Sequence, residues 1–281
     1  MLERYPTPDS TPPTPVRYPS ASPAQPSISA EINVATRKQH TELNRLIIER
    51  LPLALPVRPW GWRRGRCPAL LAQGIAAFAQ IYFEFEGTWS AIEGSPEKDE
   101  NGDMVHWLAN LRPRGLERTQ RLRSDLRRLG CSTALAIGRC EPAQAGRVSV
   151  KPHILIAYAW VMYMAIFSGG RWIRQQLAAA GPECELSFLS FDGDEDGEDL
   201  KQDFKAGLAR AEELLSPQER QEVVEEAQAL FYRCIALVAV LDRKVQWQYF
   251  RQVAIRGISA TCIIWLLWLL STDGFRRLDK E

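Results

Sequence analysis

The segment ATRKQHTE at residues 35–42 combines residue types that can bind a metal and an anionic ligand. The chain has three histidines, and His40 is the one predicted to lie on a buried helical face. A neutral imidazole nitrogen in such a place is a good axial ligand for heme iron. Arg37, one helical turn earlier, can reach a heme propionate as a charge-assisted pair. A histidine on an apolar helix face is also often an ordinary core residue, so this segment alone leaves both interpretations open.

A second segment joins an apolar helix to two adjacent glycines. Residues 158–172 read YAWVMYMAIFSGGRW and are apolar on nearly every side until Ser168. A glycine in a helix interior costs roughly 1 kcal/mol relative to alanine, so Gly169 and Gly170 need a reason. Such a pair lets a helix bend and lets the backbone approach a flat ligand closely. Tight helix–helix packing or a helix break explains the pair equally well from this segment alone.

Residues 192–203, DGDEDGEDLKQD, echo a calcium-binding loop. Asp192, Asp194 and Asp196 stand at positions 1, 3 and 5, with Gly197 at position 6. Position 12 is Asp203 rather than the glutamate of that motif. The sequence therefore favours an acidic, solvated loop before a helix.

The segment at residues 57–68 mixes tryptophans and arginines. It is predicted to be an exposed loop. A solvated loop with packed tryptophans is favoured over contact with a membrane surface or RNA. The residues concerned are Arg58, Trp60, Trp62, Arg63, Arg64 and Arg66.

Together the segments at residues 35–42 and 158–172 resemble the heme oxygenase family. That family pairs an N-terminal A-T-x-x-x-H-T segment with a distal helix ending in L-S-G-G, and residues 35–41 and 167–170 match these two motifs. Residues 81–86, IYFEFE, look like the family's second-helix segment, and residues 216–231 look like its later T-P…E-E-A…F helix. The matches keep chain order and cover roughly residues 29–245. With the hydrophobic tail, they indicate a divergent member of the membrane-anchored, biliverdin-producing type.

The resemblance implies a set of heme contacts. His40 would be the proximal iron ligand, and Gly169 and Gly170 would lie over the distal face of the heme. Arg37 stands where the family often has a basic partner for a propionate, and the helix near residues 205–210 supplies further such contacts. The full set of implied heme-binding residues besides His40 is Arg37, Tyr163, Ser168, Gly169, Gly170, Lys205 and Arg210.

One position departs from the family pattern. Two residues before the S-G-G serine the family has an aspartate, which organises the distal water network that delivers protons. Here that residue is Ile166, the preceding glycine is Ala165 and an arginine further up is Met162. No carboxylate lies between Lys151 and Gly181. Because an apolar distal side cannot hold the same proton-delivering waters, no catalytic residue is assigned, whereas heme binding needs only the pocket and the ligand.

The activity implied by the resemblance is oxidative cleavage of heme to biliverdin, iron and carbon monoxide. Heme would be both substrate and cofactor, dioxygen the co-substrate, and a partner reductase the source of electrons. Two alternatives stay open, a non-catalytic heme-binding or sensing protein and a helical scaffold without heme. The scaffold would have its pocket filled by the side chains of Met162, Met164, Ile166 and Phe167.

The elements that must position these residues are predicted to be helices. Apolar residues recur at spacings of three and four, and few segments alternate with period two, so the fold class is all-α. Ser29 is the expected N-cap of the first helix, which Pro52 and Pro56 end. Further helices are expected over roughly residues 69–92, 104–110, 114–129, 153–179, 199–214 and 217–247. Residues 1–28, rich in Pro, Ser and Thr, are expected to be a disordered leader, and residues 29–250 the heme oxygenase-like domain.

The C-terminal segment is predicted to anchor the chain in a membrane. Residues 257–270, GISATCIIWLLWLL, are fourteen uncharged residues, and the anchor is placed at 255–272. This is marginal beside the ~17–25 residues of a spanning helix. Trp265 and Trp268 near one end and arginines flanking both ends favour the interface. The alternative is a buried terminal helix. An anchor so near the C-terminus would leave the domain in the cytosol.

The bulk composition excludes several classes of protein. Lys+Arg number 35 and Asp+Glu 34, so no global basic field indicates a nucleic-acid partner. Six scattered cysteines without a C-x-x-C pair argue against a zinc site and a disulfide framework and favour a reducing, cytosol-facing location. No continuous apolar stretch at the N-terminus indicates a secretory signal peptide.

Overall fold

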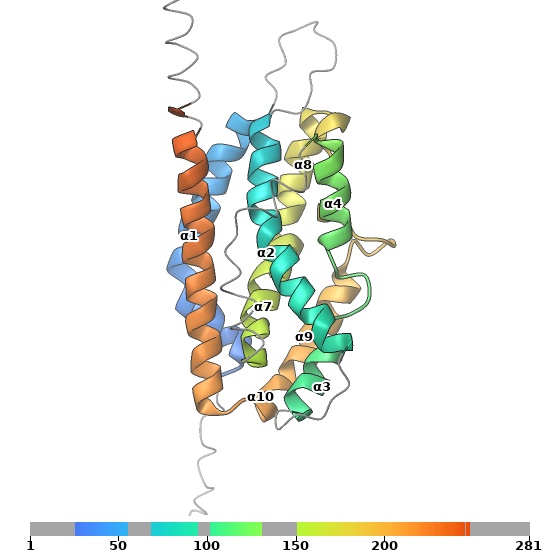
Figure 1. The fold of residues 1–281 in the computed structure, drawn as a ribbon, viewed down its shortest axis with the longest axis vertical. Helices are drawn as coiled ribbons and strands as arrows, with labels where there is room; N and C mark the ends of the chain where they lie inside the picture. Colours follow the sequence, from blue (N-terminus) through green and yellow to red (C-terminus); the bar gives the residue numbers. More distant parts are fainter. Residues whose placement is uncertain (1–25, 56–68, 95–101, 131–150, 245, 248–281) are drawn as a thin grey trace, which may run out of the picture.

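A computed structural model of the chain describes residues 26–55, 69–94, 102–130, 151–244 and 246–247. Within these ranges all regular structure is helical and no strand occurs, which confirms the all-α prediction. The helices surround a common core (Figure 1). They are α1 (Ile28–Ala54), α2 (Ala69–Gly94), α3 (Gly102–Leu111), α4 (Thr119–Arg128), α7 (Leu155–Ala165), α8 (Arg171–Ala180), α9 (Glu198–Ala209), the short α10 (Ala211–Leu214) and a helix over residues 217–244, here called the C-terminal helix.

Helix α1 begins earlier than the sequence predicts. Its N-cap is Ser27, whose hydroxyl accepts a hydrogen bond from the amide of Ala30, so the cap predicted at Ser29 is wrong by two residues. The reason is burial, because Ile28 is fully buried and helical geometry from this residue onward places it on the core face. At the other end Pro52 lies inside the last turn and the helix ends at Ala54. Residues 1–25 of the expected leader lie outside the described residues.

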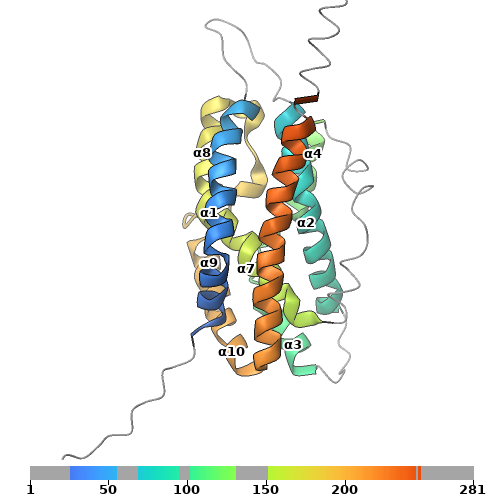
Figure 2. The same ribbon diagram turned by 90° about the vertical axis from the view of Figure 1, so that its left-hand side faces the viewer.

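Helices α1, α7, α8 and the C-terminal helix run in the same direction, and α2 runs against them (Figures 1 and 2). Contacts between α1 and the C-terminal helix follow this parallel order. Gln228 donates to the carbonyl of Ala35, and Gln39 donates to the hydroxyl of Tyr232. The C-terminal helix is thus fixed lengthwise against the helix that carries His40.

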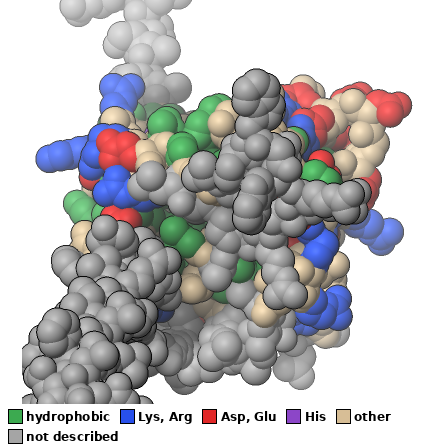
Figure 3. All heavy atoms as spheres, turned by 90° about the horizontal axis from the view of Figure 1, so that it is seen from above, with side chains coloured by type: hydrophobic (Ala, Val, Ile, Leu, Met, Phe, Trp, Pro, Cys, Tyr) green, Lys and Arg blue, Asp and Glu red, His purple; other side chains and the backbone are tan. Residues whose placement is uncertain are grey.

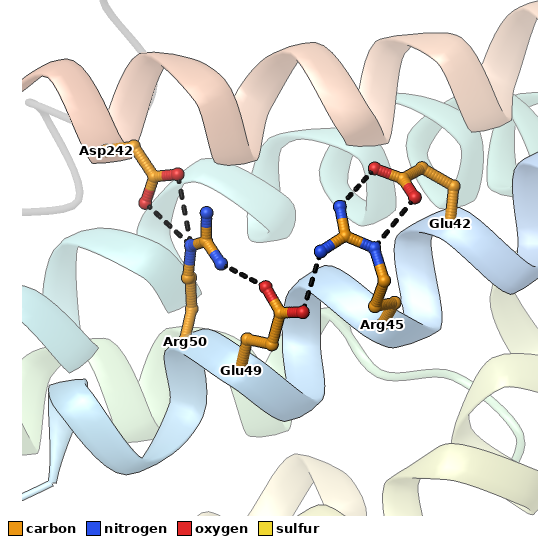
Figure 4. Close-up of polar contacts among 5 residues, drawn as sticks. All are labelled: Glu42, Arg45, Glu49, Arg50 and Asp242. Carbon is orange, nitrogen blue, oxygen red and sulfur yellow. Dashed lines mark hydrogen bonds and ion pairs between the residues drawn. The ribbon is translucent and has the colours of Figure 1, made fainter.

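A chain of ion pairs continues this attachment toward the end of α1 (Figure 4). Arg45 lies between Glu42 and Glu49, with N–O distances of 2.7 and 2.6 Å, and Arg50 joins Glu49 to Asp242 of the C-terminal helix. Hydrogen bonds from Arg45 lower the pKa of both glutamates. Exposed pairs of this kind contribute little individually to stability. Three of the four lie within α1, and the pair between Arg50 and Asp242 joins α1 to the C-terminal helix.

The apolar helix expected over residues 153–179 is divided into four pieces. A short turn, η1 (Pro152–Ile154), leads into α7, a π-helical turn, η2 (Ile166–Gly170), follows, and α8 completes the run. The hydroxyl of Ser168 donates to the carbonyl of Met164 within the π turn. The two glycines therefore mark a local change of helical pitch, as expected where glycine or an unusual side-chain bond interrupts a helix.

One stretch of the described residues has the length and hydropathy of a membrane span. It runs from Pro152 to Ala180, and 78% of its most apolar part is buried inside the fold. Every residue of α7 from Leu155 to Tyr163 is buried, so this stretch is the central core helix of the domain. The membrane anchor predicted at residues 255–272 lies outside the described residues.

The end of the molecule at which α1, α4 and α8 finish carries charges of both signs. Figure 3 shows this face, with basic and acidic side chains around hydrophobic ones. No field of one sign dominates what is drawn in colour there, in keeping with the nearly balanced charge of the sequence.

Candidate active site between helix α1 and the distal turn

His40 is exposed rather than buried. The prediction of a buried face holds for Ile32 and Thr36, which lie two turns and one turn earlier on α1, but it is wrong for His40 itself. At this level Gln39 points into the contact with the C-terminal helix, and the imidazole lies beside the Phe231 ring, with centroids 5.9 Å apart and planes inclined by 78°. An imidazole in this position has a partner that restrains it and a side that can accept a ligand.

The π turn η2 is here called the distal turn. One direct contact brings helix α1 and the helix before this turn, α7, to a common level. The indole of Trp160 on α7 donates to the side-chain oxygen of Asn33 on α1 at 3.0 Å. His40 follows Asn33 by seven residues, and Ser168 follows Trp160 by eight. Because the two helices run in the same direction and rise about 1.5 Å per residue, His40 and the π turn lie at a similar height beyond this contact.

The distal turn presents a small-residue face at that height. Ala165 and Ser168 are exposed, and a Cβ added at Gly169 would meet nothing within 4 Å. At Gly170 the same added atom would lie 3.4 Å from the side chains of Ile166 and Leu189. The two glycines therefore differ, since Gly169 borders open space and Gly170 packs against the core. A flat ligand can approach the backbone at Gly169.

Ile166 and its neighbours point away from this open face. Ile166 is 2% exposed and its side chain lies beside the Gly170 backbone, while the Phe167 ring stacks on Phe191 at 4.8 Å. Met162 is buried and Met164 half-buried. Two of the four side chains that would fill the pocket of a heme-free scaffold are thus directed into the core.

Tyr163, an expected heme contact, lies in the core. It is fully buried, and its hydroxyl donates to Glu86 on α2 at 3.0 Å. Burial raises the pKa of Tyr163 well above its ordinary value, and the charge of Glu86 adds to this effect. The Tyr163 side chain therefore links α7 to α2 inside the core.

The three expected propionate partners are all on the surface. Arg37 is exposed on α1, one turn before His40, Lys205 is exposed on α9, and Arg210 is exposed just after that helix ends. No ion pair joins any of the three to another residue in the part of the chain that the structure describes. Each guanidinium or ammonium group therefore remains accessible to an anion.

Glu86 is a central residue that the sequence motifs did not single out. It is 3% exposed, and it accepts hydrogen bonds from the amides of Arg118 and Thr119 at 2.8 Å each, besides the one from Tyr163. Its carboxylate lies at the first turn of α4, where the helix dipole favours a negative charge. A signal for it does exist, because Glu86 follows Tyr82 by four residues and so shares the apolar face of α2.

The acidic segment that echoed a calcium loop is engaged with arginines. Asp192 pairs with Arg121 at 2.5 Å, and Asp196 accepts two hydrogen bonds from Arg174. Among the described residues no group of three or more His, Cys, Asp or Glu is arranged to hold a metal ion. The loop leads into α9, as the alternative interpretation of this motif requires.

Comparison with known proteins identifies the family to which this chain belongs. The family model described as heme oxygenase matches residues 72–240, which is more than half of the chain. The chain belongs to the heme oxygenase family. Among curated protein sequences none matches it significantly.

Solved heme oxygenases share the fold at low sequence identity. Heme oxygenase-2 from Synechocystis sp. PCC 6803 in complex with heme and NO aligns with a TM-score of 0.61 and 16% identity, over 79% of this chain and 88% of that one. Heme oxygenase-1 from the same organism, in complex with heme, gives 0.56 and 16% over 81% and 100%. Heme oxygenase 2 from Chlamydomonas reinhardtii, without heme, gives 0.58 and 19% over 77% and 98%. At such identities these neighbours establish the heme oxygenase fold, and the chain is a divergent member.

Proposed function

We propose that this chain binds heme between α1 and the distal turn, with His40 as the iron ligand. The observation that carries the proposal is the accessible imidazole of His40 at the level of the open face formed by Ala165, Ser168 and Gly169. The fit is chemical as well as spatial, since a neutral imidazole is a common axial ligand and a small-residue surface admits a flat ring. The solved Synechocystis relatives, which are in complex with heme, support heme as the ligand.

The residues around this face have distinct tasks in the proposal. Phe231 holds the imidazole edge-on and so restricts its rotation. Arg37, Lys205 and Arg210 are accessible cations that can pair with the propionates. Bound heme supplies the iron at which dioxygen is activated.

We propose oxidative cleavage of heme to biliverdin, iron and carbon monoxide as the reaction type, at a low rate. Family membership supports the reaction, with electrons from a partner reductase. The low rate follows from Ile166, which is buried and apolar at the position where the family carries an acid. The same observation favours the second candidate, a heme-binding protein that does not turn over its heme.

The deciding experiment uses the full chain in mild detergent. Hemin is added and the absorption spectrum recorded, and a reductant and oxygen are then supplied and the products identified. A histidine-ligated spectrum with slow biliverdin formation supports the enzyme. The same spectrum with no product supports the non-catalytic protein, and no spectral change contradicts heme binding.

Replacing Ile166 by aspartate is expected to increase biliverdin formation. A carboxyl group at this buried position would have a raised pKa and would be protonated near neutral pH. Because the side chain packs beside the Gly170 backbone, it would deliver its proton through water held at the turn rather than by direct contact with the ligand. General-acid delivery is typically worth roughly 10²–10⁴-fold, and the gain is measured as the rate of biliverdin appearance with a fixed reductase.

The control is Ile166→Asn. Asparagine is similar to aspartate in polarity and size but has no carboxyl proton to donate. It is expected to leave the rate near that of the wild type. Efficient wild-type turnover that Ile166→Asp does not change would instead mean that another group delivers the proton.

We propose that residues 257–270 attach the chain to a membrane, with the domain on the cytosolic side. Support comes from the fourteen uncharged residues and their flanking arginines. Deletion from about residue 250 onward is expected to move the protein from the membrane pellet to the soluble fraction without loss of heme binding. A full chain that fractionates as a soluble monomer without detergent contradicts the proposal.

A further inference from the structure

The ring of Phe191 contacts both a buried arginine and the distal turn. It stacks on Phe167, the second residue of η2, with centroids 4.8 Å apart and planes inclined by 7°. The guanidinium carbon of Arg118 also lies over this ring, 4.6 Å from its centroid. Arg118 is itself fully buried and donates to backbone carbonyls that include those of Leu116 and Ser190. The position of Phe191 therefore determines where Phe167, and with it the distal turn, can lie.

The backbone of Gly197 packs directly against the Phe191 ring. Its φ is +76°, and a Cβ added there would lie 2.5–2.7 Å from three atoms of the Phe191 ring. Real Cβ atoms do not approach other atoms so closely, and the ring already contacts Arg118 and Phe167, which limits how far it can shift. Only glycine fits at this point of the acidic loop.

The same loop is tied to the first turns of α8, which follows the distal turn directly. Arg174 donates to both oxygens of Asp196, at 2.6 and 2.5 Å, and Arg171 donates to Glu198 at 3.1 Å. Asp196 has a φ of +49°, a left-handed conformation that aspartate tolerates better than most residues. The loop thus contacts the distal turn at Phe167 and the following helix, α8, at Arg171 and Arg174.

We propose that the acidic loop at residues 191–198 is a clamp that positions the distal turn over the heme. Phe191, Gly197 and Asp196 act as positioning residues, which set the distance of Ser168 and Gly169 from the heme face without touching the ligand. The inference rests on the proposed heme site, because the turn it positions is the distal wall of that site. It also gives the loop a task other than metal binding.

The test compares two glycines of this loop in the full chain. Gly197→Ala pushes a methyl group into the Phe191 ring, whereas Gly193→Ala meets nothing within 4 Å. Both positions have a left-handed backbone, with φ of +76° and +87°, so the matched pair separates the ring contact from backbone strain. Circular dichroism verifies that each variant folds, and Phe191→Leu, which loses the stacking, replaces Gly197→Ala if that variant does not.

Two measurements follow, one with heme and one without it. In the ferrous heme complex with added carbon monoxide, Gly197→Ala is expected to shift the C–O stretching frequency and to change the association rate by about tenfold, within the ~10²-fold that a misplacement of about 1 Å can cause. Gly193→Ala is expected to match the wild type. In the heme-free chain, hydrogen exchange at residues 166–172 is expected to accelerate only in Gly197→Ala.

The outcomes separate this inference from the proposed function. Wild-type heme binding with Gly197→Ala and Gly193→Ala alike in both measurements overturns the clamp and leaves heme binding intact. A wild-type chain without a histidine-ligated spectrum overturns the proposed function and the placement of heme beneath the turn. Hydrogen exchange in the heme-free chain then still tests whether the loop positions the turn. Equal exchange in Gly197→Ala and Gly193→Ala overturns that positioning role as well.

Discussion

Replacing His40 by alanine is expected to abolish the histidine-ligated heme spectrum and to weaken heme binding by at least ~10²-fold. Losing a residue that merely hydrogen-bonds to a metal ligand typically lowers metal affinity about 10–100-fold, and losing the ligand itself costs at least as much. The physical reason is that the His40 imidazole is an accessible nitrogen ligand at the level of the distal turn. Fold stability is expected to change little, because the side chain is exposed and meets Phe231 only edge-on. Hemin titration followed by absorption measures both the affinity and the ligation state.

The matched control is His106→Ala. His106 is also an exposed histidine on a helix, in α3, and its loss is expected to leave spectrum and affinity unchanged. His153 is a poorer control because it is buried and bonded to Glu222 at 2.8 Å. If His40→Ala retains the wild-type spectrum, His40 is not the ligand.

The second large effect is expected on stability, from Glu86→Ala. This substitution leaves the amides of Arg118 and Thr119 and the hydroxyl of Tyr163 without their acceptor. It also removes the negative charge that faces the buried Arg118 guanidinium. Leaving a buried donor without its acceptor typically costs about 1–3 kcal/mol per donor, and three donors lose their acceptor here. The measurement is the free energy of unfolding from urea titration.

Glu84→Ala is the comparison, two residues earlier on the same helix. Glu84 is only half-buried, and its loss is expected to change the free energy of unfolding by about 0.5 kcal/mol or less. Glu86→Gln should fall between the two. An amide has one acceptor oxygen, whereas both carboxylate oxygens of Glu86 accept bonds. Equal unfolding midpoints for Glu86→Ala and Glu84→Ala would show that the three bonds contribute nothing to stability.

Several features could be predicted from sequence because they depend on neighbours in the chain. Helical spacing predicts the all-α fold, and the approximate extents of α2 and α3 follow from runs of apolar residues. Short motifs also place His40 on the first helix and Ser168, Gly169 and Gly170 at a helix interruption. A shift of two residues at the α1 N-cap is the scale of error that such local signals allow.

Other features depend on partners far along the chain, and only the tertiary structure decides them. His40 is exposed because Gln39 takes the contact with Tyr232, which lies 193 residues further on. Gly169 borders open space and Gly170 packs on Leu189, although the two are adjacent and identical in type. Residue type and helical spacing limit which side chains can share a face, but which of those faces is covered depends on packing between helices that are distant in sequence.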